Sequence, residues 1–121
     1  MKKVLVFGVF DGIHDGHKEF FKQVKKHGDH IIVAVTQDKV VQELKNKKPK
    51  NNLKFRKEQL IKLKLADEVT EGDKQTNSWK IIGKYNPDVI ALGYDQKELK
   101  ISLEKYLKEN KLEIEVKIMQ S

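Results

Sequence analysis

Cysteine is absent from the 121-residue chain, and no long apolar segment is present either. Without cysteine there is no disulfide scaffold, no thiolate zinc site and no cysteine nucleophile. No apolar run approaches the ~18 residues that a membrane-spanning helix needs. The apolar residues 4–10 resemble a signal peptide only briefly, because Gly8 and Asp11 interrupt them and no small-residue cleavage site follows. We therefore expect a cytoplasmic protein.

The charge of the chain is unbalanced in the basic direction. There are 25 Lys and Arg against 18 Asp and Glu, which gives a formal net charge of +7. Such an excess predicts an anionic partner, either nucleic acid or a phosphorylated small molecule, although lysine also coats helix surfaces for solubility alone. The length of 121 residues favours a single domain, residues 1–121, with one core of two or three layers.

Segments typical of strands and helices alternate along the chain. Short apolar, β-branched runs predict buried strands, and apolar residues at helical spacing predict helices between them. The expected strands are residues 3–9, 30–36, 68–71, 89–93 and 112–119, and the expected helices are residues 17–27, 38–44, 53–64, 78–85 and 97–110. Strands separated by helices form right-handed βαβ units. This pattern predicts an α/β fold, a Rossmann-like doubly wound parallel sheet of about five strands in a three-layer α/β/α arrangement.

Two of these helices carry more detailed expectations. Asn77 or Ser78 can cap the helix that ends near residue 85. The helix over residues 53–64 is expected to turn four apolar side chains into the core: Leu53, Leu60, Ile61 and Leu63. Before that helix, residues 45–52 (KNKKPKNN) form a basic segment without apolar residues, which predicts a loop.

A glycine-bearing turn follows the first strand and leads straight into a helix. In open parallel sheets, ligands bind beyond the carboxyl ends of the strands. His14 and His17 lie three residues apart around Gly16 in this turn, so both imidazoles can donate hydrogen bonds to one phosphate group. Surface histidines and a metal site are the alternatives, but two imidazoles without a clear third ligand are weak evidence for a metal. We therefore expect phosphate chemistry at this turn.

The segment GVFDGIHDGH (residues 8–17) resembles the signature of the cytidylyltransferase-like nucleotidyltransferases. That family includes glycerol-3-phosphate cytidylyltransferase, FAD synthase and phosphopantetheine adenylyltransferase, and the resemblance runs from Val4 to about Gln96. It implies transfer of a nucleoside monophosphate from ATP or CTP to a phosphorylated acceptor, with release of pyrophosphate and with Mg²⁺ on the triphosphate. It also implies that the two histidines bind phosphate and that nearby turn residues shape the nucleotide pocket: Gly8, Val9, Phe10, Asp11 and Gly16.

Further matches to the family follow in chain order. The resemblance implies that Lys45 and Lys47 of the basic loop, together with Arg56, hold the triphosphate, and that Gly93 and Asp95 lie near the nucleotide. A purely solvated loop and an ordinary helix-face charge are the alternatives for the lysines and for the arginine. Asp11 is a candidate ligand of Mg²⁺, or else orients a histidine or caps the turn.

The finer resemblance favours one member of the family. Residues 93–96 (GYDQ) and the GVFDG form of the turn look most like archaeal-type FAD synthase, which makes FMN adenylyltransferase the expected activity. Glycerol-3-phosphate cytidylyltransferase is the alternative. Another is a nucleotide-binding protein without turnover, because no S/T-rich phosphate-binding segment precedes Ser121. We expect a nucleoside triphosphate and a phosphorylated small molecule as partners, but neither nucleic acid nor membrane, and the resemblance implies a homodimer.

Overall fold

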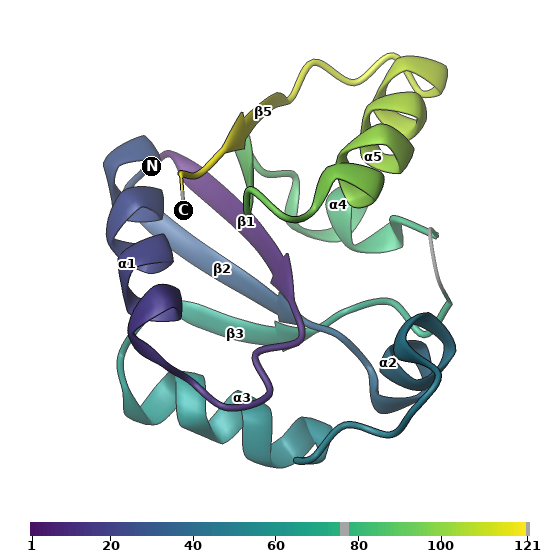
Figure 1. The fold of residues 1–121 in the computed structure, drawn as a ribbon. Helices are drawn as coiled ribbons and strands as arrows, with labels where there is room; N and C mark the ends of the chain where they lie inside the picture. Colours follow the sequence, from purple (N-terminus) through teal and green to yellow (C-terminus); the bar gives the residue numbers. More distant parts are fainter. Residues whose placement is uncertain (76–77, 121) are drawn as a thin grey trace.

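Five strands form one parallel sheet in the computed structural model, which describes residues 1–75 and 78–120 (Figure 1). The elements in chain order are β1 (Lys3–Gly8), α1 (Asp15–Val24), the 3₁₀ turn η1 (Lys25–His27), β2 (His30–Val35), α2 (Asp38–Lys45), α3 (Leu53–Lys62), β3 (Glu68–Glu71), α4 (Lys80–Tyr85), β4 (Val89–Leu92), α5 (Lys97–Glu109) and β5 (Glu115–Ile118). The predicted fold class is therefore confirmed, and most predicted boundaries lie within three residues of the observed ones.

The order of the strands places a crevice beside β1. The sheet runs β3-β2-β1-β4-β5, and all four neighbouring pairs are parallel. The chain builds outward from β1 to β3 and then returns to the other side of β1 with β4. The strand order thus reverses between β1 and β4, and the carboxyl ends of these two strands are where an open α/β sheet binds its ligand.

Alternate residues of the strands build two separate cores, one on each face of the sheet. Val6 and Val33 pack with α1 and α3, whereas Leu5 and Ile32 pack with α4 and α5. Figure 1 shows these two pairs of helices on opposite sides of the sheet. Both faces are covered, which explains why β1, β2 and β4 are apolar at nearly every position rather than at every second one.

Helix α3 departs from the prediction in the face that it buries. Leu60 is fully buried, but Ile61 and Leu63 are 57% and 39% exposed, so the prediction that they face inward was wrong. A helix turns about 100° per residue, so positions 53, 56 and 60 share one face and position 61 does not. The inward position between Leu53 and Leu60 belongs to Arg56, a charged residue that an apolar periodicity cannot assign to the core.

The start of α4 also differs from the prediction. Asn77 lies outside the described residues, and Ser78 does not cap the helix, because its hydroxyl donates to Asp73 Oδ2 at 2.7 Å. The same carboxylate oxygen is 3.4 Å from the amide nitrogen of Ile81 in the first turn of α4. The helix start is therefore supported from the preceding loop. Among the described residues, no helix has both the length and the apolar content required to cross a membrane.

Candidate nucleotide site

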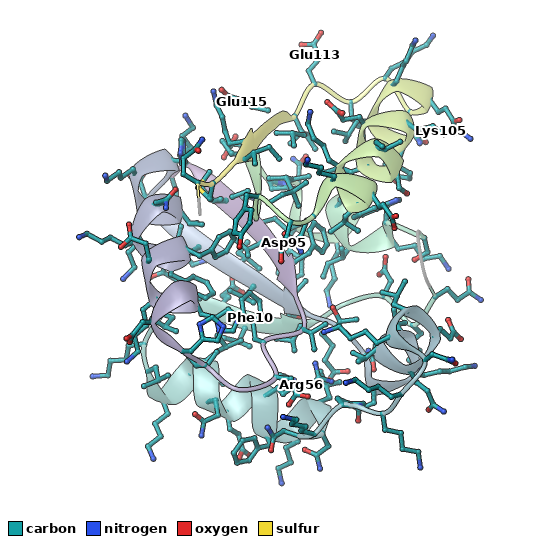
Figure 2. All side chains as sticks on the ribbon, in the orientation of Figure 1. Phe10, Arg56, Asp95, Lys105, Glu113 and Glu115 are labelled. Atoms are coloured by element: carbon teal, nitrogen blue, oxygen red, sulfur yellow. The ribbon has the colours of Figure 1, made fainter. Side chains whose placement is uncertain are left out.

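A cavity of about 700 Å³ lies at the carboxyl ends of β1 and β4. Its walls come from the turn after β1, the start of α1, the loop between β4 and α5, and the end of α2. The structure brings ten predicted site residues into this lining: Gly8, Val9, Phe10, Asp11, His14, Gly16, His17, Lys45, Gly93 and Asp95. Figure 2 shows Phe10, Asp95 and Arg56, which come from three separate segments around this end of the sheet.

Phe10 fixes the shape of the turn that forms the floor of the cavity. Its backbone is left-handed, with φ of 50°, which is unusual for a residue with a large side chain. Its ring is buried and packs against His17 and Phe21, with ring centroids 5.4 Å apart in both cases. A Cβ atom on Gly8 would lie 2.5 Å from the Phe10 ring, so only glycine fits there. The turn is thus held by an anchored aromatic side chain.

The two histidines are oriented by backbone donors at the start of α1. Gly16 N donates to His14 Nδ1 at 3.0 Å, and His14 N donates to His17 Nδ1 at 3.2 Å. A backbone N–H can only donate, so each Nδ1 accepts and carries no proton. In both neutral rings the proton is therefore on Nε2. The pair forms a capping box at the N-terminus of α1 and leaves two N–H donors for a ligand.

The rings of these histidines are stacked, which brings their donors close together. Their centroids lie 3.9 Å apart with an interplanar angle of 29°. A Cβ atom on Gly16 would lie 2.8 Å from His14 Cε1, so glycine is required for the ring of His14 to cover the first turn of the helix. Helix N-termini also attract anions through their free N–H groups and dipole. The arrangement is suited to a phosphate group.

The surroundings of His17 favour its neutral form. Burial lowers the pKa of His17 below its ordinary value of 6.5, and the neighbouring His14 lowers it further, while Asp95 raises it in part. At neutral pH the ring can therefore accept the His14 N–H at Nδ1 and donate from Nε2 without first losing a proton. This donor adds hydrogen-bonding capacity to the cavity without requiring a fixed positive charge.

The loop between β4 and α5 is tied to the end of β1 by Gln96. Its Oε1 accepts from Gly93 N at 2.7 Å, and its Nε2 donates to the carbonyl of Phe7 at 3.1 Å. These bonds position the loop that carries Gly93 and the exposed Asp95, both of which line the cavity together with the histidines. Gln96 is a residue of the site that the sequence did not reveal. Its signal was its place in the GYDQ segment directly after a buried strand, where the side chain of a loop residue can reach the neighbouring strand end.

Asp11 faces both the cavity and the basic loop. Its Oδ2 accepts from Lys50 N at 2.6 Å, and its Oδ1 accepts from Asn51 N at 3.0 Å and from Asn51 Nδ2 at 2.9 Å. Burial alone raises the pKa of Asp11, but these hydrogen bonds and the charge of Arg56 outweigh that effect and lower it below its ordinary value. The carboxylate therefore stays ionised and holds the end of the loop.

Arg56 and Lys47 are the two predicted site residues that the structure does not bring into the lining of the cavity. Arg56 is fully buried below the turn, where its guanidinium donates to the carbonyls of Val9, Thr36 and Asn51 and to the carboxylate of Asp38. Lys47 is exposed on the basic loop. Arg56 thus ties together three chain segments below the site.

A second cavity of about 730 Å³ adjoins the first on the side of α2, α4 and α5. The two cavities share the end of β1, Lys45, Asp95 and Gln96. Apolar side chains form much of its wall, among them Val40, Leu44 and Trp79. Trp79 is largely buried, and its ring lies edge-on to the ring of Phe7, with the two centroids 5.3 Å apart. Its position beside a ligand-sized space had no signal in the sequence.

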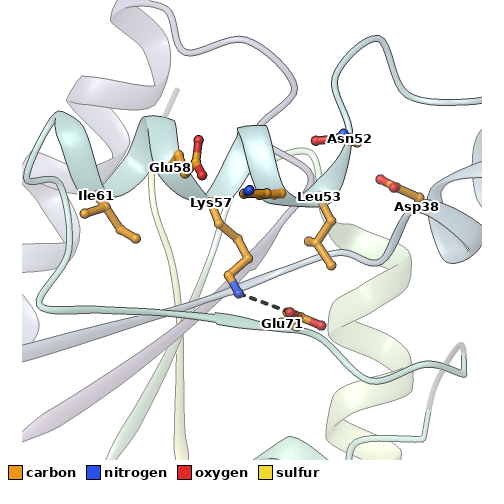
Figure 3. Close-up of a pocket in the computed structure, with 8 residues that line it drawn as sticks. Asp38, Asn52, Leu53, Lys57, Glu58, Ile61 and Glu71 are labelled. Carbon is orange, nitrogen blue, oxygen red and sulfur yellow. Dashed lines mark hydrogen bonds and ion pairs between the residues drawn. The ribbon is translucent and has the colours of Figure 1, made fainter.

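A separate groove runs along α3, on the outside of the molecule (Figure 3). Lys57 crosses it to pair with Glu71 at 3.1 Å, and Leu53 and Ile61 lie along its wall. It includes no predicted site residue. In the described part of the chain, no three histidine or carboxylate side chains converge to hold a metal ion.

Comparison with known proteins finds matches over most of the chain. The family model described as cytidylyltransferase-like matches residues 5–120. The chain is 42% identical to FAD synthase of Thermococcus sibiricus over 94% of this chain and 77% of that protein. It is 41% identical to FAD synthase of Thermococcus onnurineus over 78% of this chain, and the match covers 63% of that relative, a little under two-thirds of its length.

A solved structure shares the fold over nearly its whole length. It is described as the lipopolysaccharide core biosynthesis protein from Thermoplasma volcanium and superposes with a TM-score of 0.89. The two chains are 29% identical, and the match covers 98% of this chain and 96% of the other. The family match spans nearly all of the sheet and both walls of the cavity. The chain therefore belongs to the cytidylyltransferase-like family, and it is a nucleotidyltransferase.

Proposed function

We propose that the protein is an FAD synthase, which transfers AMP from ATP to the phosphate of FMN and releases pyrophosphate. The observation that carries the proposal is the stacked pair His14 and His17, which lines a cavity at the switch point of the sheet and has both Nδ1 atoms bonded to backbone donors. Relatives named FAD synthase at 42% and 41% identity support this choice of nucleotide and acceptor.

In the proposed reaction, a phosphate oxygen of FMN attacks the α-phosphorus of ATP. A new P–O bond forms, the bond from the α-phosphorus to the αβ-bridging oxygen breaks, and pyrophosphate leaves with that electron pair. The attacking phosphate is already an anion, so no general base is required. His14 and His17 donate from Nε2 to oxygens of the triphosphate, where negative charge increases in the transition state.

The second cavity is suited to the acceptor. It adjoins the histidine cavity and shares the end of β1 with it, so a ligand there would place its phosphate beside the other cavity. Its apolar wall, with Leu44 and Trp79, favours a flat and largely apolar ring system. Lys45 lines both cavities, so its ammonium group can neutralise phosphate on either reactant. Lys47, further along the same loop, would add charge as the loop closes.

A divalent cation accompanies the triphosphate in the proposed reaction, and we propose Mg²⁺. This ion keeps several waters and binds mainly through substrate phosphates and one or two carboxylates. The residues present fit such an ion, because Asp11 and Asp95 line the cavity, and within residues 1–75 and 78–120 the structure gives Asp11 Oδ2 one hydrogen-bond donor, Lys50 N. Mg²⁺ would neutralise charge on the triphosphate and on the leaving pyrophosphate.

The test is pyrophosphate release in the presence of Mg²⁺, with ATP and CTP each combined with FMN, glycerol 3-phosphate and phosphopantetheine. We expect release only from ATP with FMN, and a product with the mass of FAD. Release from CTP with glycerol 3-phosphate instead would replace the proposal with cytidylyl transfer. Nucleotide binding without release from any pair would leave a binding protein without turnover.

A further inference from the structure

We propose that Asn51 is a positioning residue, which holds the basic loop (residues 45–52) in register with the phosphate-binding turn (residues 8–17). Asn51 is not among the residues that line either cavity. It is placed where the loop meets the turn. The proposal rests on the proposed function in one respect, namely that the lysines of the loop contact the triphosphate of ATP.

The hydrogen bonds of Asn51 join the loop to the turn from two directions. Its backbone N and its Nδ2 both donate to Asp11 Oδ1, at 3.0 and 2.9 Å. Its carbonyl accepts from Arg56 Nε at 3.0 Å, and Arg56 Nη1 donates to the carbonyl of Val9 at 3.0 Å. Val9 and Asp11 flank Phe10, whose left-handed backbone sets the turn. Asn51 therefore completes a closed circuit of hydrogen bonds around Phe10.

The rest of the loop has little to hold it in place. Residues 45–48 are exposed, and α2 ends at Lys45 with Asn46 in the left-handed conformation, φ 58°. The loop has no apolar side chain that could anchor it in the core. A lysine on a disordered loop must lose conformational freedom to meet a phosphate, which weakens binding. Fixing the far end of the loop at Asn51 reduces that loss.

The neighbouring asparagine provides a matched control. Asn52 Oδ1 accepts from Phe55 N at 2.9 Å and caps α3, so its side chain supports a helix and does not hold the loop to the turn. Asn51 and Asn52 have the same side chain and are adjacent in the chain. Asn51 is partly exposed and Asn52 is exposed. Alanine at either position removes one side-chain bond, but only one of the two bonds joins the loop to Asp11.

The experiment compares Asn51→Ala, Asn51→Asp and Asn52→Ala in the full chain. The dissociation constant of a non-hydrolysable ATP analogue is measured by calorimetry, KM values for ATP and FMN by steady-state kinetics, and Tm by thermal denaturation. For Asn51→Ala we expect about tenfold weaker binding of the analogue, as expected for losing one hydrogen bond to a charged group, and a matching rise in KM for ATP alone. Asn51→Asp places a second carboxylate beside Asp11 and should have a larger effect. Asn52→Ala should lower Tm and leave analogue binding unchanged.

A spectroscopic measurement separates positioning from general loss of structure. The backbone amides of Lys50 and Asn51 donate to Asp11, so their hydrogen exchange, followed by NMR, should become faster in Asn51→Ala and stay constant in Asn52→Ala. Wild-type analogue binding in Asn51→Ala, or equal weakening in both alanine variants, overturns the proposal. If the wild-type protein binds the analogue but makes no FAD, then FMN is not the acceptor and the proposed function is wrong. The comparison of analogue binding by Asn51→Ala and Asn52→Ala still tests the role of Asn51 in that case.

Discussion

The phosphate-binding turn and the basic loop border the same cavity but are built in opposite ways. In the turn, Phe10 is buried, Gly8 and Gly16 admit ring atoms where a Cβ would collide, and both histidines are held by backbone donors. In the loop, residues 45–48 are exposed, and hydrogen bonds to Asp11 and Arg56 gather at its far end.

This difference indicates that the turn and the loop act on the phosphates in different ways. A transition state on phosphorus gains most from donors that are already oriented, because they need no reorganisation during the reaction. Charge on a triphosphate can be neutralised over a longer range by lysines that adjust to the ligand. The turn therefore supplies geometry, and the loop supplies charge. Arg56 and Asn51 link the two segments, so changes to each part should have separable consequences.

The largest effect is expected from replacing Arg56, which joins the phosphate-binding turn to the basic loop. Arg56→Met removes the buried donor of three partly buried hydrogen bonds, to the carbonyls of Val9, Thr36 and Asn51. The unfolding free energy should fall by about 3 kcal/mol, because an acceptor left unpaired away from water costs ~1–3 kcal/mol. Chemical denaturation measures this.

Lys57→Met, one residue further along the same helix, is the control for this prediction. Lys57 makes an ion pair with Glu71 across the groove on the outside of α3, and such partly exposed pairs contribute little (Figure 3). Its unfolding free energy should change by less than ~1 kcal/mol. Equal losses in the two variants would mean that Arg56 is an ordinary helix-face charge.

The next largest effect is expected from a change in the phosphate-binding turn alone. His17→Asn can keep an acceptor near the position of Nδ1 and thus the bond from His14 N, but it lacks the donor at Nε2. Turnover should fall by ~10²-fold or more, with Tm little changed, since a donor to the transition state is lost and the cap is kept. His27→Ala, in η1, is the control and should keep wild-type turnover. Wild-type turnover in His17→Asn would remove the assigned role.

The fold could be predicted because local patterns and topology rules agree. The buried strands β1, β2 and β4 are apolar runs between glycine, proline or charged residues, and helices between strands require parallel pairing. The failures arise where tertiary contacts decide. Ile61 is apolar but faces solvent, and the inward face of α3 is occupied by Arg56, whose polar partners lie 5 to 47 residues away in sequence. No local pattern contains that information.

The candidate site divides in the same way. The histidines, the glycines of the turn and the pair Gly93 and Asp95 follow directly from a motif at a strand end, and the structure gathers them in one cavity. Their assigned roles are still predictions. Asn51, Gln96 and Trp79 were not predicted as site residues, because their importance comes from which segments they join. An asparagine in a polar loop has no sequence signal that reveals a carboxylate 40 residues earlier in the chain.

Gly16→Ala tests the packing of the turn with a smaller expected effect. The new methyl group would lie 2.8 Å from His14 Cε1 and 3.0 Å from Nδ1, so the ring of His14 must move out of place. Turnover should fall by about tenfold, as a displaced donor retains part of its effect.

Gly83→Ala in α4 is the matched control for the change at Gly16. Apart from its chain neighbours and the backbone of its own helix, no atom of the described residues lies within 4 Å of the position that its Cβ would take. Alanine there should raise the unfolding free energy by ~0.5–1 kcal/mol, because glycine is unfavourable inside a helix, and turnover should stay constant. Loss of turnover in both variants would show that the effect at Gly16 comes from the helix backbone and not from the histidine ring.

The smallest effect is expected from lowering the pH, because protonation then frees a single ring, that of His17, from the hydrogen bond that orients it. Protonation of His17 at Nδ1 breaks its bond from His14 N, and burial holds the pKa of His17 below 6.5. Since kcat/KM reports the free enzyme, it should reach a plateau toward higher pH, be lowered by less than about twofold at pH 6.5, and have an acid midpoint below pH 6.5.

Stability should follow pH with the same sign. The unfolded chain binds the proton of His17 first as pH falls, so the neutral ring's contribution is fully present above pH 6.5 and is lost as pH falls toward the lower folded pKa. Denaturation of the wild type and of His17→Asn between pH 5 and pH 8 isolates this contribution, since the variant has no imidazole at this position. An acid midpoint of kcat/KM at or above 6.5, or the same pH dependence of stability in both proteins, would mean that the turn does not hold His17 in its neutral form. The distinction between a preorganised turn and an adjustable loop would then lose its electrostatic basis, because a cationic His17 would act as the lysines do.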